Sequence, residues 1–338
     1  MSRSNTINLI KALASQVIVL HHLAIYAPMT DWLVEIWPSI IDFFFDQGRL
    51  AVQPFLVIGG FLAAKSMHHQ NQAEFWPLIQ RRYLRLAPPF LMSLVLVVLA
   101  TIYFGKDLTE SEWVSPIPSF YEFIAHVLFM QDILNVPSIS AGAWYLAIDL
   151  QLFGLLVLMH GCRRKWKLLD LHTPALVAFI TLASIHIFSR YAVLDIWAIY
   201  FFSAYGLGIL VYKVKSRPES KHWFFVVSAM LVIDWILDPR TRPLLALSTA
   251  WLLYSSESKY LKSLNQLTHP SIHFLSNISY SLFVCHFAVI IIYSGLWERW
   301  EFQGQLHAIG FTLAAWMTSL LLGYAMHMLV QSRIKITE

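Results

Sequence analysis

Residues 7–27 read INLIKALASQVIVLHHLAIYA, an apolar stretch of bilayer-spanning length that also contains Lys11 and His22. An ionisable side chain in hydrocarbon costs about 2.5–3.5 kcal/mol on insertion scales, so such residues usually face a partner or a water-filled site. Eleven helical residues return to within about 20° of the starting direction, which places both side chains on one face, roughly 16 Å apart along the axis. The spacing predicts one elongated site, lined by Lys11 and His22 at two different depths in the membrane. The competing interpretation is that Lys11 snorkels to the membrane interface and His22 packs inside the protein.

The rest of the chain has the same apolar character. Of 338 residues, 57% are hydrophobic and 13% are charged, against about 25% charged in ordinary soluble domains, and the mean hydropathy is +0.58. No polar stretch is long enough for a separate soluble domain, so we expect one membrane domain over residues 1–338. The net charge of +4 comes from Lys and Arg clustered in short loops, which does not indicate nucleic-acid binding. Cys162 and Cys285 are too few for a disulfide framework or a metal site, and we expect no metal.

These features predict an all-α polytopic membrane protein with about ten transmembrane helices and both termini cytoplasmic. If segment 119–134 also crossed the membrane, the basic residues of 163–167 would fall outside, against the positive-inside rule. We therefore expect that segment to lie at the outer surface or to re-enter. The predicted spans are 7–27, 50–67, 84–104, 143–160, 172–189, 193–212, 222–237, 243–256, 273–294 and 306–330.

A second polar motif stands at the start of the third span. Arg82 and Arg85 are three residues apart and would be neighbours on one helix face. Two guanidinium forks at the cytoplasmic mouth suit a polyphosphate. The alternative is ordinary anchoring by positive charges next to lipid headgroups. Pro88 and Pro89 follow, and prolines at these positions can break or kink the helix.

Polar residues also interrupt two later spans. Asp149 and Gln151 lie in the phrase GAWYLAIDLQLF, and His286 follows Tyr280 and Ser281 in ISYSLFVCHF. Intramembrane polar groups of this kind suggest a site that faces the interior of the protein. Hydrogen bonds between packed helices would explain the same residues without a site.

In combination, these motifs resemble acyltransferase family 3, a family of membrane O-acyltransferases of bacterial glycans. The likeness extends over nearly the whole chain, although Lys11, Gly59 and Asp149 stand where the family usually has Arg, Ser and Glu. The matching phrases are Lys11-x10-His22, residues 55–62, Arg82-x-x-Arg85 with Pro88, Trp144-Tyr145-Leu146 with Asp149, and residues 279–286.

The resemblance implies transfer of an acyl group, commonly acetyl, from cytoplasmic acyl-coenzyme A to a carbohydrate hydroxyl. It also implies a multi-pass location in the bacterial inner membrane, in contact with lipids, donor and glycan. In that scheme His22 is the general base, and a covalent acyl-histidine is the alternative that the sequence leaves open. The implied roles of the other residues are catalytic for Asp149 and His286, coenzyme A binding for Lys11, Arg82 and Arg85, and substrate contact for Trp144, Tyr145 and Tyr280.

Three alternatives stay open at this point. A multi-span transporter or flippase for a glycan precursor would also place Lys, His and Asp inside the membrane, although no convincing internal repeat supports it. A family member that has lost catalysis could serve as a scaffold. A different membrane O-acyltransferase family would explain His22 but not the paired arginines.

Overall fold

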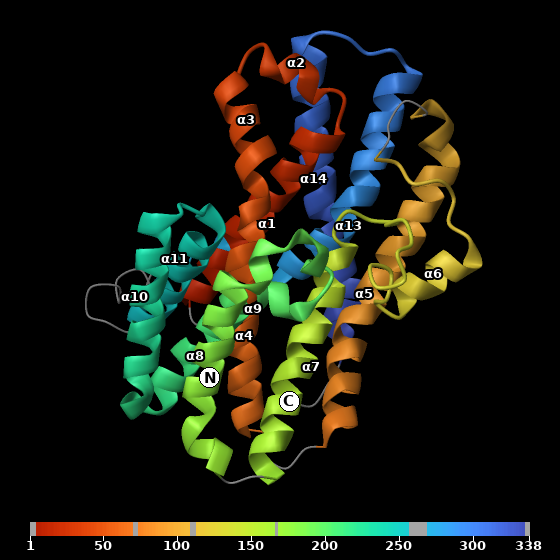
Figure 1. The fold of residues 1–338 in the computed structure, drawn as a ribbon. Helices are drawn as coiled ribbons and strands as arrows, with labels where there is room; N and C mark the ends of the chain where they lie inside the picture. Colours follow the sequence, from red (N-terminus) through yellow and green to blue (C-terminus); the bar gives the residue numbers. More distant parts are fainter. Residues whose placement is uncertain (1–4, 70–73, 109–112, 166–167, 257–268, 335–338) are drawn as a thin grey trace.

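The computed structural model describes residues 5–69, 74–108, 113–165, 168–256 and 269–334, and within these ranges every regular element is a helix (Figure 1). Short 3-10 turns connect several of them. The α-helices are α1 (Asn5–Tyr26), α2 (Thr30–Val34), α3 (Pro38–Gln47), α4 (Val52–His69), α5 (Phe75–Phe104), α6 (Phe120–Val127), α7 (Ala143–Lys165), α8 (Leu168–His186), α9 (Ala198–Ser216), α10 (Lys221–Leu237), α11 (Thr241–Ser255), α13 (Pro270–Arg299) and α14 (Gln305–Leu329).

Eight stretches of the described chain are long and apolar enough to cross a membrane. The prediction of an all-α multi-pass membrane protein is therefore confirmed. Two predicted spans are missing from the eight: α9, which is largely buried by other helices, and α11, which has fifteen residues. The count of ten stays a prediction, and the side chains of the basic residues 163–167 lie outside the described part. The eight stretches are Asn5–Tyr26, Pro38–His68, Phe75–Asp107, Ala143–Gly161, Thr173–Arg190, Pro218–Leu237, Pro270–Arg299 and Gln305–Arg333.

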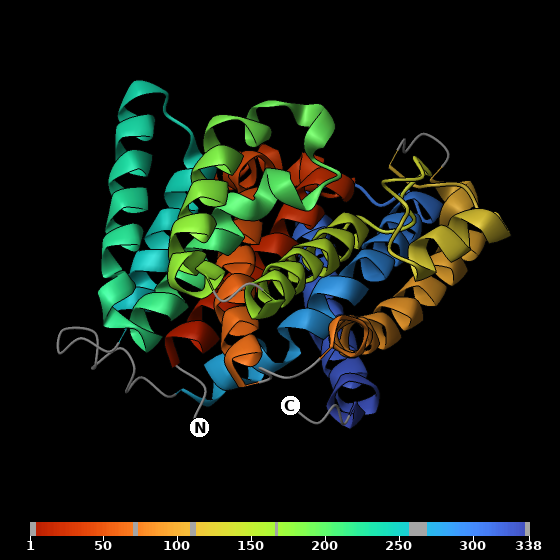
Figure 2. The same cartoon turned by 60° about the horizontal axis from the view of Figure 1, so that its bottom comes forward.

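α4 and α9 pack against each other in the middle of the molecule, between α10 and α11 on one side and α5 on the other (Figures 1 and 2). A Cβ atom at Gly208 would lie 1.9 Å from a backbone carbonyl oxygen of α4, and one at Gly60 would lie 2.0 Å from the carbonyl oxygen of Tyr205. Only glycine allows this approach, as small residues do at other membrane helix interfaces. The contact also places Gly59 and Tyr205 beside Asp149 of α7.

α1, α13 and α14 form the second main packing unit. α1 and α13 run parallel, because Asn8 contacts His273 near their starts and His22 contacts His286 further along. α14 follows α13 after a five-residue turn and returns antiparallel to it (Figure 1). α1 therefore begins on the side where α14 ends. This agrees with placing both chain ends on one side, and their cytoplasmic location stays a prediction.

Segment 119–134 folds back into the molecule instead of crossing it. α6 has eight residues, about 12 Å of helix, against about 30 Å of hydrocarbon. The carbonyl oxygen of its last residue accepts a 2.8 Å hydrogen bond from the Tyr83 hydroxyl, and the rings of Tyr83 and Phe129 pack 5.4 Å apart. Tyr83 lies near the start of the thirty-residue α5, so the segment returns along most of that helix (Figure 1). This arrangement agrees with the re-entrant alternative.

His126 holds the re-entrant segment together. Its Nδ1 donates to the carbonyl oxygen of Glu122 at 2.8 Å, and its Nε2 accepts from the amide of Ile139 at 3.0 Å. The ring is fully buried, and burial lowers the pKa of His126. The neutral ring is the form that makes both hydrogen bonds.

The helix break suggested by Pro88 and Pro89 is not present, since α5 continues from Phe75 to Phe104. Each proline lacks the amide hydrogen that would bond four residues back. Two residues before Pro88, the Tyr280 hydroxyl of α13 donates to the carbonyl oxygen of Leu86 at 2.6 Å. Tyr280 thus joins α13 to α5 where the intrahelical bonding of α5 is weakest.

Candidate active site

A pair of histidines from the two parallel helices forms the centre of the candidate active site. His22 of α1 and His286 of α13 are 264 residues apart in sequence, yet His22 Nδ1 lies 2.6 Å from His286 Nε2. The two ring planes differ by only 4°. His286 is fully buried, whereas His22 is 9% exposed. Of the two residues, His22 is therefore the more exposed.

The hydrogen bonds around His286 determine which nitrogen of each ring carries a proton. His286 Nδ1 lies 3.1 Å from the carbonyl oxygen of Leu282, which can only accept, so this nitrogen is protonated. In the neutral ring Nε2 is then an acceptor, and it accepts from the Nδ1–H of His22. The lone pair of a neutral His22 therefore lies on Nε2. No described residue hydrogen-bonds to that nitrogen.

Aromatic rings pack over the histidine pair toward the end of α1. The ring of Tyr26 lies 5.5 Å from that of His22, and Trp113 lies 5.2 Å from Tyr26 and 5.9 Å from Phe287. Trp113 belongs to the stretch between α5 and α6. Sequence reasoning missed Trp113, because it stands in a polar connection without a motif, and only the fold brings it to α1 and α13.

Arg82 and Asp149 form an ion pair inside the protein. Arg82 Nε donates to Asp149 Oδ2 at 2.8 Å, and Nη2 donates to Oδ1 at 2.5 Å. The side chains are only 18% and 5% exposed. A bidentate pair of this kind lets two charges remain at membrane depth that would each be costly alone. Sequence reasoning gave the two residues different roles, and the structure joins them in one unit.

Three tyrosines lie within electrostatic reach of this ion pair: Tyr145, Tyr205 and Tyr280. The Tyr205 hydroxyl is buried and has no hydrogen-bond partner among the described residues. The sequence did not single out Tyr205, since a tyrosine in an apolar span has an ordinary explanation in helix packing. With its unpartnered hydroxyl, it is a polar group available to a ligand or an ordered water.

A chain of aromatic rings connects the ion pair to the histidines. The Tyr145 ring packs 5.3 Å from Phe283, whose ring lies 6.3 Å from His286. Asp149 lies one helical turn beyond Tyr145 on α7. The two polar centres are therefore neighbouring parts of one region, bounded by α1, α5, α7 and α13.

The other predicted residues occupy separate positions around this region. Trp144 stacks on Phe201 of α9 with the ring centroids 5.4 Å apart. Its neighbour Tyr145 instead packs on Phe283, so the two side chains contact different helices. Lys11 is partly buried on α1, about 16 Å of helix before His22. Arg85 is exposed on α5. Their predicted contacts with donor and substrate stay predictions.

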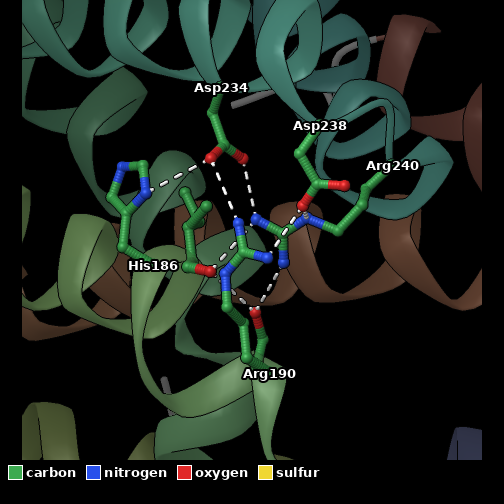
Figure 3. Close-up of polar contacts among 7 residues, drawn as sticks. His186, Arg190, Asp234, Asp238 and Arg240 are labelled. Atoms are coloured by element: carbon green, nitrogen blue, oxygen red, sulfur yellow. Dashed lines mark hydrogen bonds and ion pairs between the residues drawn. The ribbon is translucent and has the colours of Figure 1, made fainter.

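A second polar cluster joins α8 to the turn between α10 and α11 (Figure 3). Asp234 accepts from Arg240 at 2.7 Å and lies 3.5 Å from Arg190 and 3.3 Å from His186. Arg190 also pairs with Asp238 at 2.8 Å. Arg240 in addition donates to a backbone carbonyl oxygen of α8. Two arginines paired with two aspartates thus join the end of α8 to α10 and the turn that follows it, which is a structural role.

The described residues contain no group of three His, Cys, Asp or Glu side chains that could hold a metal ion. The expectation of a metal-free site stays a prediction.

Comparison with known proteins adds a family to this geometry. A family model described as an acyltransferase domain matches residues 4–328. A protein of Acidianus two-tailed virus, named as a proposed acetyltransferase (ORF330), is 23% identical over 272 residues, covering 75% of this chain and 76% of the viral protein. The regulator of hypoxia-inducible factor 1 of Caenorhabditis elegans is 31% identical over 111 residues, which is 32% of this chain and 22% of the nematode protein. No solved structure matches.

The matched region includes both histidines, the ion pair and every long helix described above. The resemblance first seen in the spaced motifs is thereby confirmed. The chain belongs to acyltransferase family 3 and is a multi-pass membrane acyltransferase.

Proposed function

We propose that this acyltransferase moves an acyl group, most simply acetyl, from cytoplasmic acyl-coenzyme A to a hydroxyl of a carbohydrate at the bacterial inner membrane. The observation that carries the proposal is the hydrogen-bonded chain from the Leu282 carbonyl through His286 to His22, which leaves a lone pair on His22 Nε2. The resemblance to O-acyltransferases of glycans supports the donor and the acceptor class. The name of the viral relative supports acetyl as the group transferred.

In this mechanism His22 Nε2 removes the proton of the acceptor hydroxyl as its oxygen attacks the thioester carbonyl. The tetrahedral intermediate then collapses, and the coenzyme A sulfur leaves and takes the proton back from His22. The products are a carbohydrate ester and free coenzyme A, and His22 returns to its neutral state. General-base catalysis of this kind typically contributes about 10²- to 10⁴-fold.

His286 serves as a positioning residue in this scheme. Its Nε2 accepts the Nδ1–H of His22 and so fixes both the tautomer and the orientation of the reacting ring. A carboxylate performs this task in the Ser-His-Asp triad. Here a neutral histidine performs it, which suits a buried site because no permanent charge is added at membrane depth.

The phosphates of the donor require cations at one end of the region. Arg82 is already engaged by Asp149, so a phosphate at Arg82 would have to share its guanidinium. Arg85 is exposed on the same helix, one turn toward the histidines, and Lys11 lies on α1. We assign the phosphate contacts to Lys11, Arg82 and Arg85, with the guanidinium of Arg82 shared between a phosphate and Asp149.

The transporter reading makes a different prediction, because transport consumes no thioester. The discriminating experiment measures alkali-labile acyl ester on cell-surface and periplasmic glycans of a deletion strain that expresses wild-type or His22→Ala protein at matched membrane levels. His21→Ala is the matched control. His21 is also buried on α1, but its Nδ1 bonds to the carbonyl oxygen of Phe44.

We expect ester with wild type and His21→Ala and none with His22→Ala. Ester formation in the His22→Ala strain would remove His22 from the reaction. Absence of ester from all strains, together with no release of coenzyme A from acetyl-coenzyme A by wild-type membranes, would favour the transporter or a scaffold.

A further inference from the structure

Trp113 differs from the exposed tryptophans found near several helix ends. Trp37, Trp197 and Trp300 are 44%, 44% and 59% exposed, as is ordinary for tryptophans of the membrane interface. Trp113 is instead partly buried, and its ring packs on Phe287 and on Tyr26, whose own ring contacts that of His22. A role in anchoring the protein to the interface does not explain this position.

The polar edges of Tyr26 and Trp113 are available to a ligand. Buried tyrosine hydroxyls and tryptophan N–H groups usually find a hydrogen-bond partner. Neither the Tyr26 hydroxyl nor the Trp113 indole N–H bonds to any residue in the described ranges, and both side chains are only partly buried. Tyr26 lies four residues after His22, on the same face of α1. Tyr26 is therefore one turn from His22, with its ring 5.5 Å from the histidine ring, and Trp113 packs on Tyr26.

Tyr26 and Trp113 also lie on a seam of the protein. Both pack against each of the two hydrophobic clusters of the structure, a large one to which most of the long helices contribute and a smaller one around α1, α2, α13 and α14. The two rings therefore lie where the clusters meet, and the ring of Tyr26 also contacts that of His22.

We propose that Trp113 and Tyr26 bind the sugar ring of the acceptor and that Trp113 makes the enzyme selective for cyclic acceptors; this inference rests on the proposed function. One face of a pyranose is lined by C–H groups, which pack on the negative face of an aromatic ring. Its rim carries hydroxyls that can bond to the Tyr26 hydroxyl and the indole N–H. A sugar held in this way directs a hydroxyl toward His22 Nε2.

The test compares Trp113→Ala, Trp113→Phe and Trp300→Ala, each purified and matched in thermal stability. Trp300 is the control, since it is an exposed tryptophan that packs only on Phe302 among the described rings. Transfer from radiolabelled acetyl-coenzyme A is measured to two probes. One is the glycan fraction acylated by wild-type membranes, and the other is glycerol, which has hydroxyls but no ring.

For Trp113→Ala we expect the KM for the glycan to rise about tenfold, as loss of one aromatic contact implies, with little change in kcat or in the KM for acetyl-coenzyme A. Trp113→Phe should recover most of the glycan affinity. Transfer to glycerol should be the same in all three variants and in wild type.

An equal loss of glycan and glycerol transfer in Trp113→Ala would overturn the proposal, because a purely structural role affects both acceptors. An unchanged KM for the glycan would overturn it as well. Failure of the wild-type protein to acylate either probe would instead refute the proposed function, so the two failures are distinguishable.

Discussion

Replacing His286 by phenylalanine tests the hydrogen-bonded chain at its most specific point. The change keeps a ring of similar size at a fully buried position, so no water replaces the lost acceptor. The Nδ1–H of His22, now bonded at 2.6 Å, would be left without a partner. An unsatisfied buried donor costs about 1–3 kcal/mol. The loss is largest in the transition state, because His22 is then positively charged and the bond to His286 is charge-assisted.

At 1.36 kcal/mol per factor of ten, this cost corresponds to a fall in kcat of about 5- to 150-fold for His286→Phe. The KM for acetyl-coenzyme A should change little, since the lost interaction is one that strengthens in the transition state. His286→Gln keeps an oxygen that can accept from His22, and we expect its kcat within about tenfold of wild type. His22→Ala should fall by about 10²- to 10⁴-fold.

The assay is steady-state transfer from radiolabelled acetyl-coenzyme A by purified variants with matched thermal stability. A wild-type kcat in His286→Phe would refute the positioning role. If His286→Gln were instead as inactive as His22→Ala, His286 would have to exchange protons itself. The double variant His22→Ala/His286→Phe should be no slower than His22→Ala alone, because a positioning residue has no effect without the group it positions.

Three further predictions concern stability, each measured by thermal unfolding in detergent. Gly208→Val should destabilise the protein by about 1–3 kcal/mol or prevent folding, because its Cβ would lie 1.9 Å from a carbonyl oxygen of α4. Asp234→Asn should cost about 1–3 kcal/mol of unfolding free energy and Asp238→Asn less than about 1 kcal/mol, since Asp234 is nearly buried and Asp238 is 48% exposed. Equal effects would contradict the larger contribution expected of Asp234. Because burial lowers the pKa of His126, the unfolded chain binds more protons just below the ordinary histidine pKa of about 6.5, so stability should fall on acidification from pH 7.5 to 5.5. His126→Gln should lose part of this pH dependence, and an identical profile in both proteins would assign it to other groups.

The fold class could be predicted from the sequence because long apolar runs and basic loops are properties of local stretches. The number of membrane-spanning helices was harder to predict. Two lysines in the last turn of α9 lower its mean hydropathy, and other helices, not lipid, cover much of its surface. The eight-residue α6 was predicted not to cross by charge alone, and the structure adds that it returns along α5 to Tyr83.

The residues of the candidate site could be predicted individually, but their partners could not. His22 and His286 stood out as ionisable residues in apolar spans, yet nothing in either span shows that α1 and α13 pack in parallel and in a register that joins the rings. Trp113 and Tyr205 carried no such signal. An aromatic residue in a membrane protein has an ordinary explanation in packing or in the interface, and only its measured neighbours separate it from the others.

The ion pair of Arg82 with Asp149 changes how the charges of the whole site are distributed. From the sequence, Arg82 counted as a free positive charge for phosphate and Asp149 as a free negative charge for catalysis. Joined at 2.8 Å and 2.5 Å, they form a neutral unit inside the protein, and the histidine pair is neutral as well. The buried region is thus polar but carries no net charge, which is the least costly way to hold hydrogen-bonding groups at membrane depth. Separated charges develop there only when His22 takes the acceptor proton, because the negative oxygen of the tetrahedral intermediate forms next to the positively charged ring in the same step. The site therefore stabilises an ion pair created by the reaction in preference to either charged species alone, which is what acyl transfer from an uncharged thioester group to an uncharged hydroxyl group requires.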